Sequence, residues 1–521
     1  MGAKLAWRVD EAWYQAWREH PSPRPAKAGA STALFSIIMP VYETPREYLS
    51  AAIQSVRNQS CPHWQLCIAN DGSKQAWIKP FLDDLASQDP RIRIAHLSAN
   101  QGIAAASNAA LALADGEWAL PMDHDDLLAE HALATVAAHL QDHDGARFLY
   151  SDSDRVDEDG QHREPFFKPC WNYLLFLAQN FPNHLTVIDT SLLRAIGGWR
   201  EGFDGSQDYD LYLRLVEQLS PAKISHVPEV LYHWRVVETA FSQQRLGEAV
   251  TAARRAVGEH LQRVQRPAAV SAPPGALIYN RIIPGFDPGP ASDVLLITYG
   301  PKPSSVAMAL ADGNEHITLL HLEETGPTLS QTMDHVLRDA KQKFVVLMHS
   351  ACIQLARDEL LELLAFSAWP DAGCVGPKCV SSNGQLLSAP DDLERLAHGN
   401  ALPWHASDRS GRGYHAHLLL QQQTVLVSPL LMAFQREHWQ SSGQSVAKNS
   451  ALQTTIAQLC LSLHTTARAN LWLGDITATF DDGVNGHRLT QDEFRSISAG
   501  CLQDNRSVRR YPEEIQWNSD C

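Results

Sequence analysis

The sequence predicts an α/β protein whose central sheet is mostly parallel. Short apolar runs of strand length alternate with stretches whose apolar residues recur at helical spacing, which is typical of doubly wound folds. Each apolar run of the first half ends in polar or acidic residues, which a parallel sheet gathers at one edge. The alternation resumes after a Pro-rich interval, so this chain of 521 residues is expected to contain two such units.

The first half supplies four apolar runs of strand length. The first is stopped by Pro40, and residues 48–56 then place apolar side chains on one helical face. The second ends in the polar residues 70–73, and the third leads to Gly102 and an Ala-rich helix over residues 104–113. The four predicted strands cover residues 35–40, 64–69, 92–97 and 118–120.

The fourth run ends in three carboxylates, Asp123, Asp125 and Asp126. Hard cations such as Mg²⁺ and Mn²⁺ prefer oxygen ligands, and Mg²⁺ is usually shared between one or two carboxylates and substrate phosphates. At the carboxyl end of a strand, the cluster therefore predicts a metal–diphosphate site. Taken alone, it is equally typical of a solvated acidic turn that caps the following helix.

Residues 34–240 resemble a family 2 glycosyltransferase of the GT-A fold, and are most like bacterial O-antigen and surface-polysaccharide transferases, rhamnosyltransferases among them. Seven segments match in family order and at family spacing: Ser36–Tyr42, Ala69–Ser73, Asn100–Gly102, Asp123–Asp126, Gly197–Trp199, Ser206–Asp210 and Tyr232–Arg235. The resemblance implies the Rossmann-like, mostly parallel sheet of nucleotide-diphospho-sugar transferases. It also implies an enzyme that moves a sugar from a nucleotide diphosphate to an acceptor hydroxyl.

The resemblance assigns roles to the carboxylates. Asp125 is expected to bind a divalent cation, Mn²⁺ or Mg²⁺, and Asp123 to contact the ribose or sugar of the donor. The cation would stabilise, as a Lewis acid, the charge that grows on the leaving diphosphate. His233 aligns with a histidine that completes this site in many family members; a half-buried histidine beside Trp234 is an equally weighted alternative. Asp126 is expected to orient the loop or cap the next helix.

Asp208 is the candidate catalytic base. An inverting transferase needs one carboxylate that takes the proton of the attacking hydroxyl. Asp208 opens the helix-like run 208–217, where the helix dipole favours its ionised form. An N-cap is the alternative role. Gln207 departs from the family, which often has an acidic residue there, and Asp210 is expected to be structural.

The resemblance also locates the donor nucleotide. Pro40, Val41 and Glu43 match the segment around the nucleobase, and Asp71 matches a residue that accepts from a pyrimidine ring N–H. A UDP- or dTDP-sugar is therefore favoured over a GDP-sugar. Gly102 lets the backbone approach the ligand closely, and the helix after it could offer N–H groups to phosphate.

One departure and two aromatic residues complete the predicted site. Ser107 stands where the family often has arginine, so neutralisation of the diphosphate would depend more on the metal. Trp199, in the glycine loop, and Trp234 are expected to contact the acceptor, a glycan or lipid-linked glycan. Core packing is the equally weighted alternative for Trp199.

Composition and repetition of the pattern divide the chain. The predicted parts are residues 1–30 (an aromatic-faced helix and a Pro-rich linker), 31–265 (the catalytic domain), 266–290 (a second linker) and 291–521 (a second GT-A-like domain). In the last part, strands are expected at residues 294–298, 317–322 and 344–348. No carboxylate stands where its metal motif or base should be, so this domain is expected to be degenerate and non-catalytic. Asp475, Asp481 and Asp482 are expected on the surface or in loops.

Composition also bears on location and partners. The net charge of −16 argues against a nucleic-acid partner. Nine scattered cysteines without a Cys-x-x-Cys pair favour a reduced, cytoplasmic compartment. Neither a signal peptide nor an apolar stretch near the ~20 residues of a membrane span is present. The Trp-rich face of residues 5–19 is interpreted as packing against the catalytic domain, and peripheral association with the inner membrane stays open.

Two function classes follow. The first is a metal-dependent, inverting glycosyltransferase that extends a cell-surface glycan such as O-antigen or capsule. The second is a non-catalytic binding or scaffold subunit of a polysaccharide assembly complex. The intact carboxylates of Asp123, Asp125 and Asp208 favour the enzyme. A nucleotidyltransferase lacks support, because no Gly-rich Arg/Lys signature for a triphosphate occurs near the N-terminus.

Overall fold

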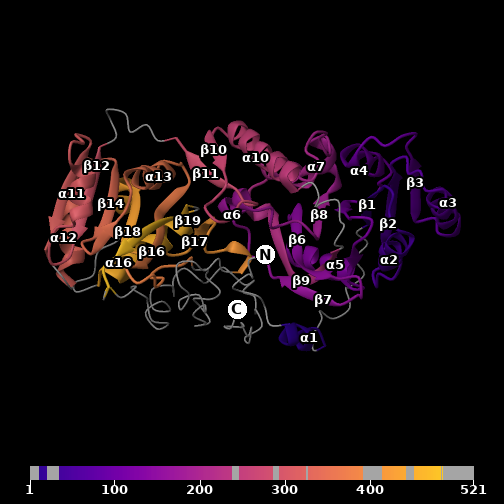
Figure 1. The fold of residues 1–521 in the computed structure, drawn as a ribbon, viewed down its shortest axis with the longest axis horizontal. Coiled ribbons are helices and arrows are strands. Elements are labelled where there is room, and N and C mark those ends of the chain that lie inside the picture. The colour runs from indigo at the N-terminus through magenta and orange to yellow at the C-terminus, as the bar shows by residue number, and fades with distance from the viewer. Residues whose placement is uncertain are drawn as a thin grey trace.

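The computed structural model of the protein shows two α/β units side by side, joined by a two-stranded ribbon (Figure 1). It describes residues 11–19, 34–236, 246–285, 293–323, 327–390, 414–441, 451–466, 468–482 and 484. Within these ranges, no helix combines the length and the apolar character needed to cross a bilayer.

The first unit alternates strands and helices as the sequence predicts. Its elements are α1 (Glu11–Glu19), β1 (Phe35–Val41), α2 (Arg46–Arg57), β2 (Trp64–Asn70), α3 (Ile78–Gln88), β3 (Ile92–His96), α4 (Ile103–Ala112), β4 (Trp118–Pro121), β5 (Leu127–Leu128), α5 (Ala132–Asp142), β6 (Phe148–Val156), β7 (His162–Phe166), α6 (Tyr173–Ala178), β8 (Thr186–Asp189), α7 (Thr190–Ala195), α8 (Gln207–Val216), η1 (Pro221–Lys223), β9 (Ile224–Arg235) and α10 (Leu246–Arg263). All four predicted strands are confirmed.

The first sheet has the order β3-β2-β1-β4-β8-β6-β9-β5, with β7 paired to β6. Strands β1 to β4 are mutually parallel, as are β6 and β9, whereas β8 and β5 run antiparallel to their neighbours. The mostly parallel sheet expected from the sequence is therefore confirmed. Because β1, β2 and β4 are parallel, the polar segments that follow them meet at one edge of the sheet.

Both faces of the first sheet are covered by helices, so its central strands are buried on both sides and rich in apolar residues. Successive residues of β1 point to opposite faces. Ile38 belongs to the core that contains Ala106 of α4, and Ile37 belongs to the core that contains Leu49 of α2. This packing fixes the orientation of β1 and β4, and so the position of the residues that follow them.

The second unit repeats this plan. Its elements are β12 (Val294–Tyr299), α11 (Ser305–Ala311), β13 (Ile317–Leu322), α12 (Pro327–Asp339), β14 (Phe344–His349), β15 (Cys352–Gln354), α13 (Arg357–Ser367), β16 (Ala372–Ser381), η3 (Tyr414–Ala416), β17 (Gln421–Thr424), β18 (Leu431–Gln435), α15 (Arg436–Ser441), α16 (Leu452–Thr465) and β19 (Ala469–Phe480). The sheet order β13-β12-β14-β18-β16-β19-β15 reproduces, in order and direction, that of β2-β1-β4-β8-β6-β9-β5.

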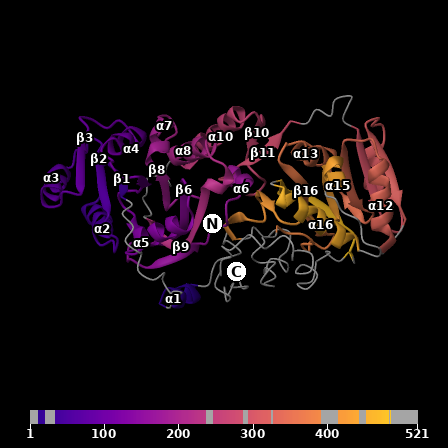
Figure 2. The ribbon, with the colours of Figure 1, turned by 180° about the vertical axis from the view of Figure 1, so that it is seen from behind.

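A ribbon of β10 (Ala268–Ser271) and β11 (Arg281–Pro284) lies between the two sheets in both views (Figure 1, Figure 2). It falls within the predicted linker 266–290, of which residues 266–285 are described. Arg281 pairs with Asp475 and, at 2.6 Å, with Glu362 of the second unit. The expectation of an exposed Asp475 is wrong, because its side chain is fully buried against Arg281; Asp481 and Asp482 are exposed as expected.

Helix α1 packs against the first unit. Tyr14 is fully buried and donates a hydrogen bond of 2.7 Å to Asp154, and the ring of Trp17 meets that of Phe167 edge-on at 5.5 Å. These contacts support packing as the role of the aromatic face. Residues 5–10 of the predicted helix lie outside the described ranges.

Candidate active site

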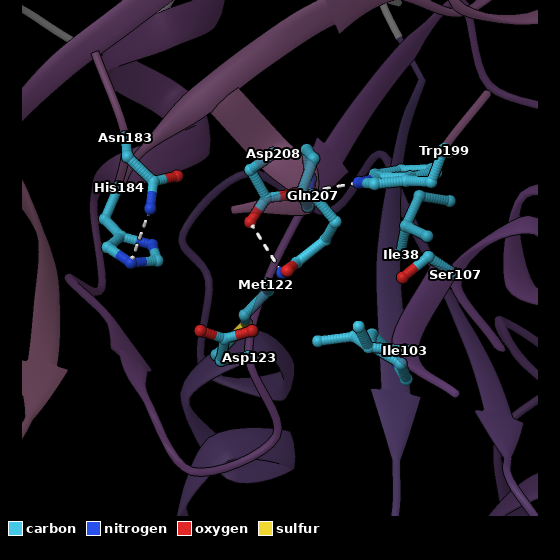
Figure 3. A pocket seen from close by; sticks show the side chains of 12 residues that line it. Ile38, Ile103, Ser107, Met122, Asp123, Asn183, His184, Trp199, Gln207 and Asp208 are labelled. Carbon is cyan, nitrogen blue, oxygen red and sulfur yellow. Dashed lines mark hydrogen bonds between the residues drawn. The ribbon is translucent and has the colours of Figure 1, made fainter. Parts of the chain in front are cut away.

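A small pocket lies at the carboxyl edge of the first sheet, where β1 and β4 end (Figure 3). Its floor and one wall are apolar. Its polar lining residues are Ser107, Asp123, Asn183, His184, Trp199, Gln207 and Asp208. The described lining contains two carboxylates and neither lysine nor arginine. The described lining is therefore acidic rather than basic.

Asp123 follows β4 and faces into this pocket (Figure 3). Its backbone N–H donates to the hydroxyl of Tyr232 at 3.2 Å. Burial raises the pKa of Asp123 to about 8, and the nearby charges of Asp125 and Asp208 contribute to the same shift. A divalent cation at this point would oppose the shift, because its charge would offset the clustered negative charge and favour the ionised carboxylate.

Asp126 orients the loop, which is one of the two roles expected for it. Its side chain is fully buried and accepts hydrogen bonds from the Tyr232 hydroxyl at 2.6 Å and from the backbone N–H of Arg235 at 2.7 Å. The guanidinium of Arg235 also donates to the backbone oxygen of Asp125 at 2.7 Å. Strand β9 thus holds the loop at the backbone of Asp125 and at the side chain of Asp126.

The donor set of the loop fits a divalent cation. In the described part of the chain, ligand atoms of Asp123, Asp126 and His184 all lie within 4.8 Å of one another. Carboxylate oxygens and a neutral imidazole are donors that suit Mn²⁺, and burial lowers the pKa of His184 to about 3, so its ring is neutral. Asp125, the ligand expected from the sequence, is not part of this group.

His233 lies in a second group, with Asp154 and His162. Its Nδ1 is 2.6 Å from one oxygen of Asp154, whose other oxygen accepts from Tyr14. Neighbouring residues of a strand point to opposite faces. Tyr232 is directed to the pocket loop, so His233 is directed to the face that α1 covers. The histidine grouped with Asp123 and Asp126 is therefore His184, and a contact of His233 with the cation stays a prediction.

Asp208 is the second residue of α8, and its carboxylate faces the same pocket as Asp123 (Figure 3). It accepts a hydrogen bond of 2.8 Å from the indole N–H of Trp199 and one of 3.3 Å from Gln207. Burial raises the pKa of Asp208, and the two hydrogen bonds act in the opposite direction. The alternative role as N-cap is wrong, because Ser206 occupies that position.

Trp199 is held in place by Asn108. Backbone N–H and C=O of Trp199 pair with the Asn108 side chain at 2.9 and 2.8 Å. Gly198 has φ +65°, and a Cβ there would lie 2.2 Å from Asn108 Oδ1, so only glycine fits. Trp199 is 3% exposed, which agrees with the core-packing alternative, although the residue also lines the pocket. Its contact with an acceptor stays a prediction.

Other predicted residues meet at the ends of β1 and β2. Pro40 lines the pocket, and Val41 is buried with its backbone oxygen 2.9 Å from the backbone N of Asp71. Glu43 accepts from the backbone N–H of residue 74. Both oxygens of Asp71 accept from the backbone N–H groups of residues 101 and 102, at 2.7 and 3.0 Å. Asp71 therefore holds the loop at Gly102, in addition to any contact that it makes with a nucleobase.

Two further observations concern the remaining predicted residues. Trp234 is partly exposed, with the Arg155 guanidinium 4.9 Å from its ring centroid. Asp210 is fully buried and pairs with Arg200 and Arg214, so it is structural as expected. His184 was missed, since it lies outside the seven matched segments.

The comparisons with known proteins agree with this geometry. The profile of the family described as "Glycosyl transferase family 2" matches residues 36–197. The putative colanic acid biosynthesis glycosyl transferase WcaA of Escherichia coli is 30% identical over 206 residues, 38% of this chain and 72% of WcaA. The chain belongs to glycosyltransferase family 2. The GT-A fold and the enzyme class expected from the sequence are confirmed.

Two other relatives are longer than the chain itself. The O-antigen biosynthesis protein RfbC of Myxococcus xanthus is 34% identical over 242 residues, which are 46% of this chain and 19% of RfbC. The uncharacterized protein y4gI of Sinorhizobium fredii is 30% identical over 475 residues, 84% of this chain and 52% of y4gI. The chain thus spans about half the length of y4gI and a fifth of RfbC.

Proposed function

We propose that this enzyme transfers a sugar, with inversion, from a nucleotide diphosphate to a hydroxyl of a growing cell-surface glycan, with the help of Mn²⁺ or Mg²⁺. The observation that carries the proposal is the pocket in which Asp123 and Asp208 face each other without a lysine or arginine among the described lining residues. The names of two relatives, which place them in O-antigen and colanic acid biosynthesis, support a glycan or lipid-linked glycan as acceptor.

The donor is proposed to lie across the ends of β1, β2 and β4. Its base would contact Pro40, Val41 and Glu43, and a ring N–H would donate to Asp71, which favours UDP- or dTDP-sugars over GDP-sugars. The diphosphate would lie over Asp123 and Asp125. When bound there, the cation supplies Lewis-acid stabilisation of the leaving diphosphate.

Asp208 is proposed as the base. Its carboxylate takes the proton of the acceptor hydroxyl while the hydroxyl oxygen bonds to the anomeric carbon and the bond from that carbon to the diphosphate breaks. Trp199 and Gln207 orient the carboxylate through the hydrogen bonds at 2.8 and 3.3 Å. One carboxylate suffices for this single displacement, in agreement with inversion.

The second unit, residues 291–521, is proposed to be non-catalytic. The strands that correspond to β4 and β5 are β14 and β15, and only Ser350 and Ala351 join them, without a carboxylate. The first turn of α16, which occupies the place of α8, contains no acidic residue. Residues 31–265 would then carry all of the chemistry, at a cytoplasmic location with peripheral membrane association left open.

A non-catalytic scaffold is not favoured as the function of the whole chain. Burying a carboxylate is costly. A scaffold would gain nothing from a buried Asp208 that faces a pocket and is oriented by Trp199, whereas a catalytic base would. Membership of the glycosyltransferase family also favours an enzyme over a scaffold.

A transfer assay with matched variants tests the proposal. The purified protein is incubated with Mn²⁺, a lipid-linked glycan and UDP-, dTDP- or GDP-sugars, and the released nucleoside diphosphate is measured. Asp208→Asn should bind the donor but lose transfer, whereas Asp123→Asn should lose donor binding. Asp204→Asn, an exposed residue before α8, is the control and should behave like wild type. Wild-type transfer by Asp208→Asn would refute the proposed mechanism.

A further inference from the structure

The wall of the pocket opposite Trp199 is formed by Asn183 and His184 (Figure 3). Both belong to the connection between α6 and β8, which contains none of the predicted site residues. His184 lies with ligand atoms within 4.8 Å of those of Asp123 and Asp126, although it forms no ion pair with either. Its position beside two carboxylates requires an explanation.

A buried lysine determines the course of this connection. Lys168 is fully buried, and its ammonium donates to the backbone oxygens of Pro182 at 3.3 Å, of Asn183 at 2.6 Å and of His184. An ammonium has three N–H donors, so three successive carbonyls use all of them. With their carbonyls turned to Lys168, residues 183 and 184 present their side chains to the pocket.

The imidazole of His184 is fixed on two further sides. Its ring stacks on Tyr232 with centroids 4.7 Å apart and planes within 15°. The hydroxyl of the same tyrosine contacts Asp126 at 2.6 Å and the backbone N–H of Asp123 at 3.2 Å. Asn183 approaches Nε2 of His184 at 3.0 Å. Tyr232 therefore links the ring to the carboxylate of Asp126 and to the backbone of Asp123.

We propose that His184 is a ligand of the divalent cation, together with Asp123, and that Lys168 is the positioning residue that holds it there. The inference rests on the proposed function of the pocket. Histidine ligands of metals are usually held in a fixed orientation by their surroundings; here the stacking on Tyr232 and the hold of Lys168 on the backbone of His184 do this. Burying a lysine is unfavourable unless its donors are satisfied. Here the satisfied donors of Lys168 hold the backbone of residues 182–184, so that the ring of His184 lies beside the carboxylates.

Direct measurement of Mn²⁺ binding tests the proposal. The full chain is titrated with Mn²⁺ without nucleotide, and free Mn²⁺ is followed by electron paramagnetic resonance. His184→Ala and His184→Gln should each weaken binding by about tenfold or more. His63→Ala, at an exposed histidine, should leave affinity unchanged. Thermal unfolding of each variant reports whether the fold is intact.

Lys168 is tested through its coupling to His184. Lys168→Met should weaken Mn²⁺ binding, and the double variant should bind no more weakly than His184→Ala, because Lys168 acts through that ring. A purely structural lysine would lower stability without this non-additivity. If Lys168→Met fails to fold, the two His184 variants still decide the central point.

The outcomes separate this inference from the proposed function. Wild-type Mn²⁺ affinity in both His184 variants would overturn the ligand assignment, while metal-dependent sugar transfer by the wild-type protein would leave the function in place. Failure of the wild-type protein to bind Mn²⁺ or any nucleotide diphosphate would overturn both.

Discussion

Substitution of Trp199 by phenylalanine isolates the electrostatic control of the proposed base. The indole N–H of Trp199 is the closer of the two side-chain hydrogen-bond donors to Asp208, at 2.8 Å against 3.3 Å for Gln207. Phenylalanine keeps an aromatic ring in the buried space but offers no donor. Burial already raises the pKa of Asp208, and the variant removes an interaction that lowers it.

The size of the effect follows from the charge on the acceptor. A hydrogen bond to a charged group contributes about 1.5–3 kcal/mol, and one pKa unit corresponds to about 1.4 kcal/mol. The pKa of Asp208 should therefore rise by about 1–2 units in Trp199→Phe. A base must be ionised to accept a proton, so activity should be lost below the new pKa and recovered above it.

The assay is the pH dependence of kcat/KM for sugar transfer, because its acid limb reports the base of the free enzyme. In Trp199→Phe this limb should move to higher pH by about 1–2 units, with rates that approach wild type at alkaline pH. Trp171→Phe, which changes a partly buried tryptophan outside the pocket lining, is the matched control.

Two results would refute the reasoning. A uniform fall in rate at every pH, with an unmoved acid limb, would show that Trp199 only packs. An unmoved limb with full activity would show that Asp208 is not the base or is not controlled by this bond.

Three further predictions address the supports of the site. Gly198→Ala should lower the free energy of unfolding by at least about 1 kcal/mol and reduce transfer, since its Cβ would displace Asn108; denaturant unfolding checks the first effect. Arg281→Met should cost about 3–5 kcal/mol, because it leaves the buried Asp475 without its cation; a loss below 1 kcal/mol in the same assay would contradict this. Tyr14→Phe should lower stability by about 1.5–3 kcal/mol but leave Mn²⁺ affinity unchanged, because α1 covers the opposite face of β9 from the pocket.

The features that could be predicted from sequence are those set by local patterns. Strand β1 is apolar and stopped by Pro40, and the loop after β4 contains its carboxylates within four residues. Parallel strands bring such ends together whatever the loops do. The sheet edge at which the pocket lies, and the presence of Asp123 and Asp208 in that pocket, could therefore be predicted from the sequence.

The histidine of the pocket could not be predicted in the same way. The residues around His233 are apolar and aromatic without alternation, so the sequence does not tell which face of β9 receives each side chain. His184 reaches Asp123 only because Lys168 draws the preceding loop inward, a contact between segments that no local pattern records.

Asp475 shows the same limit in the second unit. An acidic residue late in the chain is typical of a surface, but its partner Arg281 lies 194 positions earlier and reaches it across the junction of the units. The repeated strand order of the second sheet was indicated only by its apolar runs.

Calorimetric binding of UDP, dTDP, GDP and CDP, with and without Mn²⁺, tests the central claim most directly. The claim is that the carboxylate pocket binds a nucleotide diphosphate through a divalent cation. The account predicts binding of a pyrimidine diphosphate that requires Mn²⁺ and is lost in the variants Asp123→Asn and Asp125→Ala. Binding that is equally strong without metal, or unchanged in both variants, would contradict it.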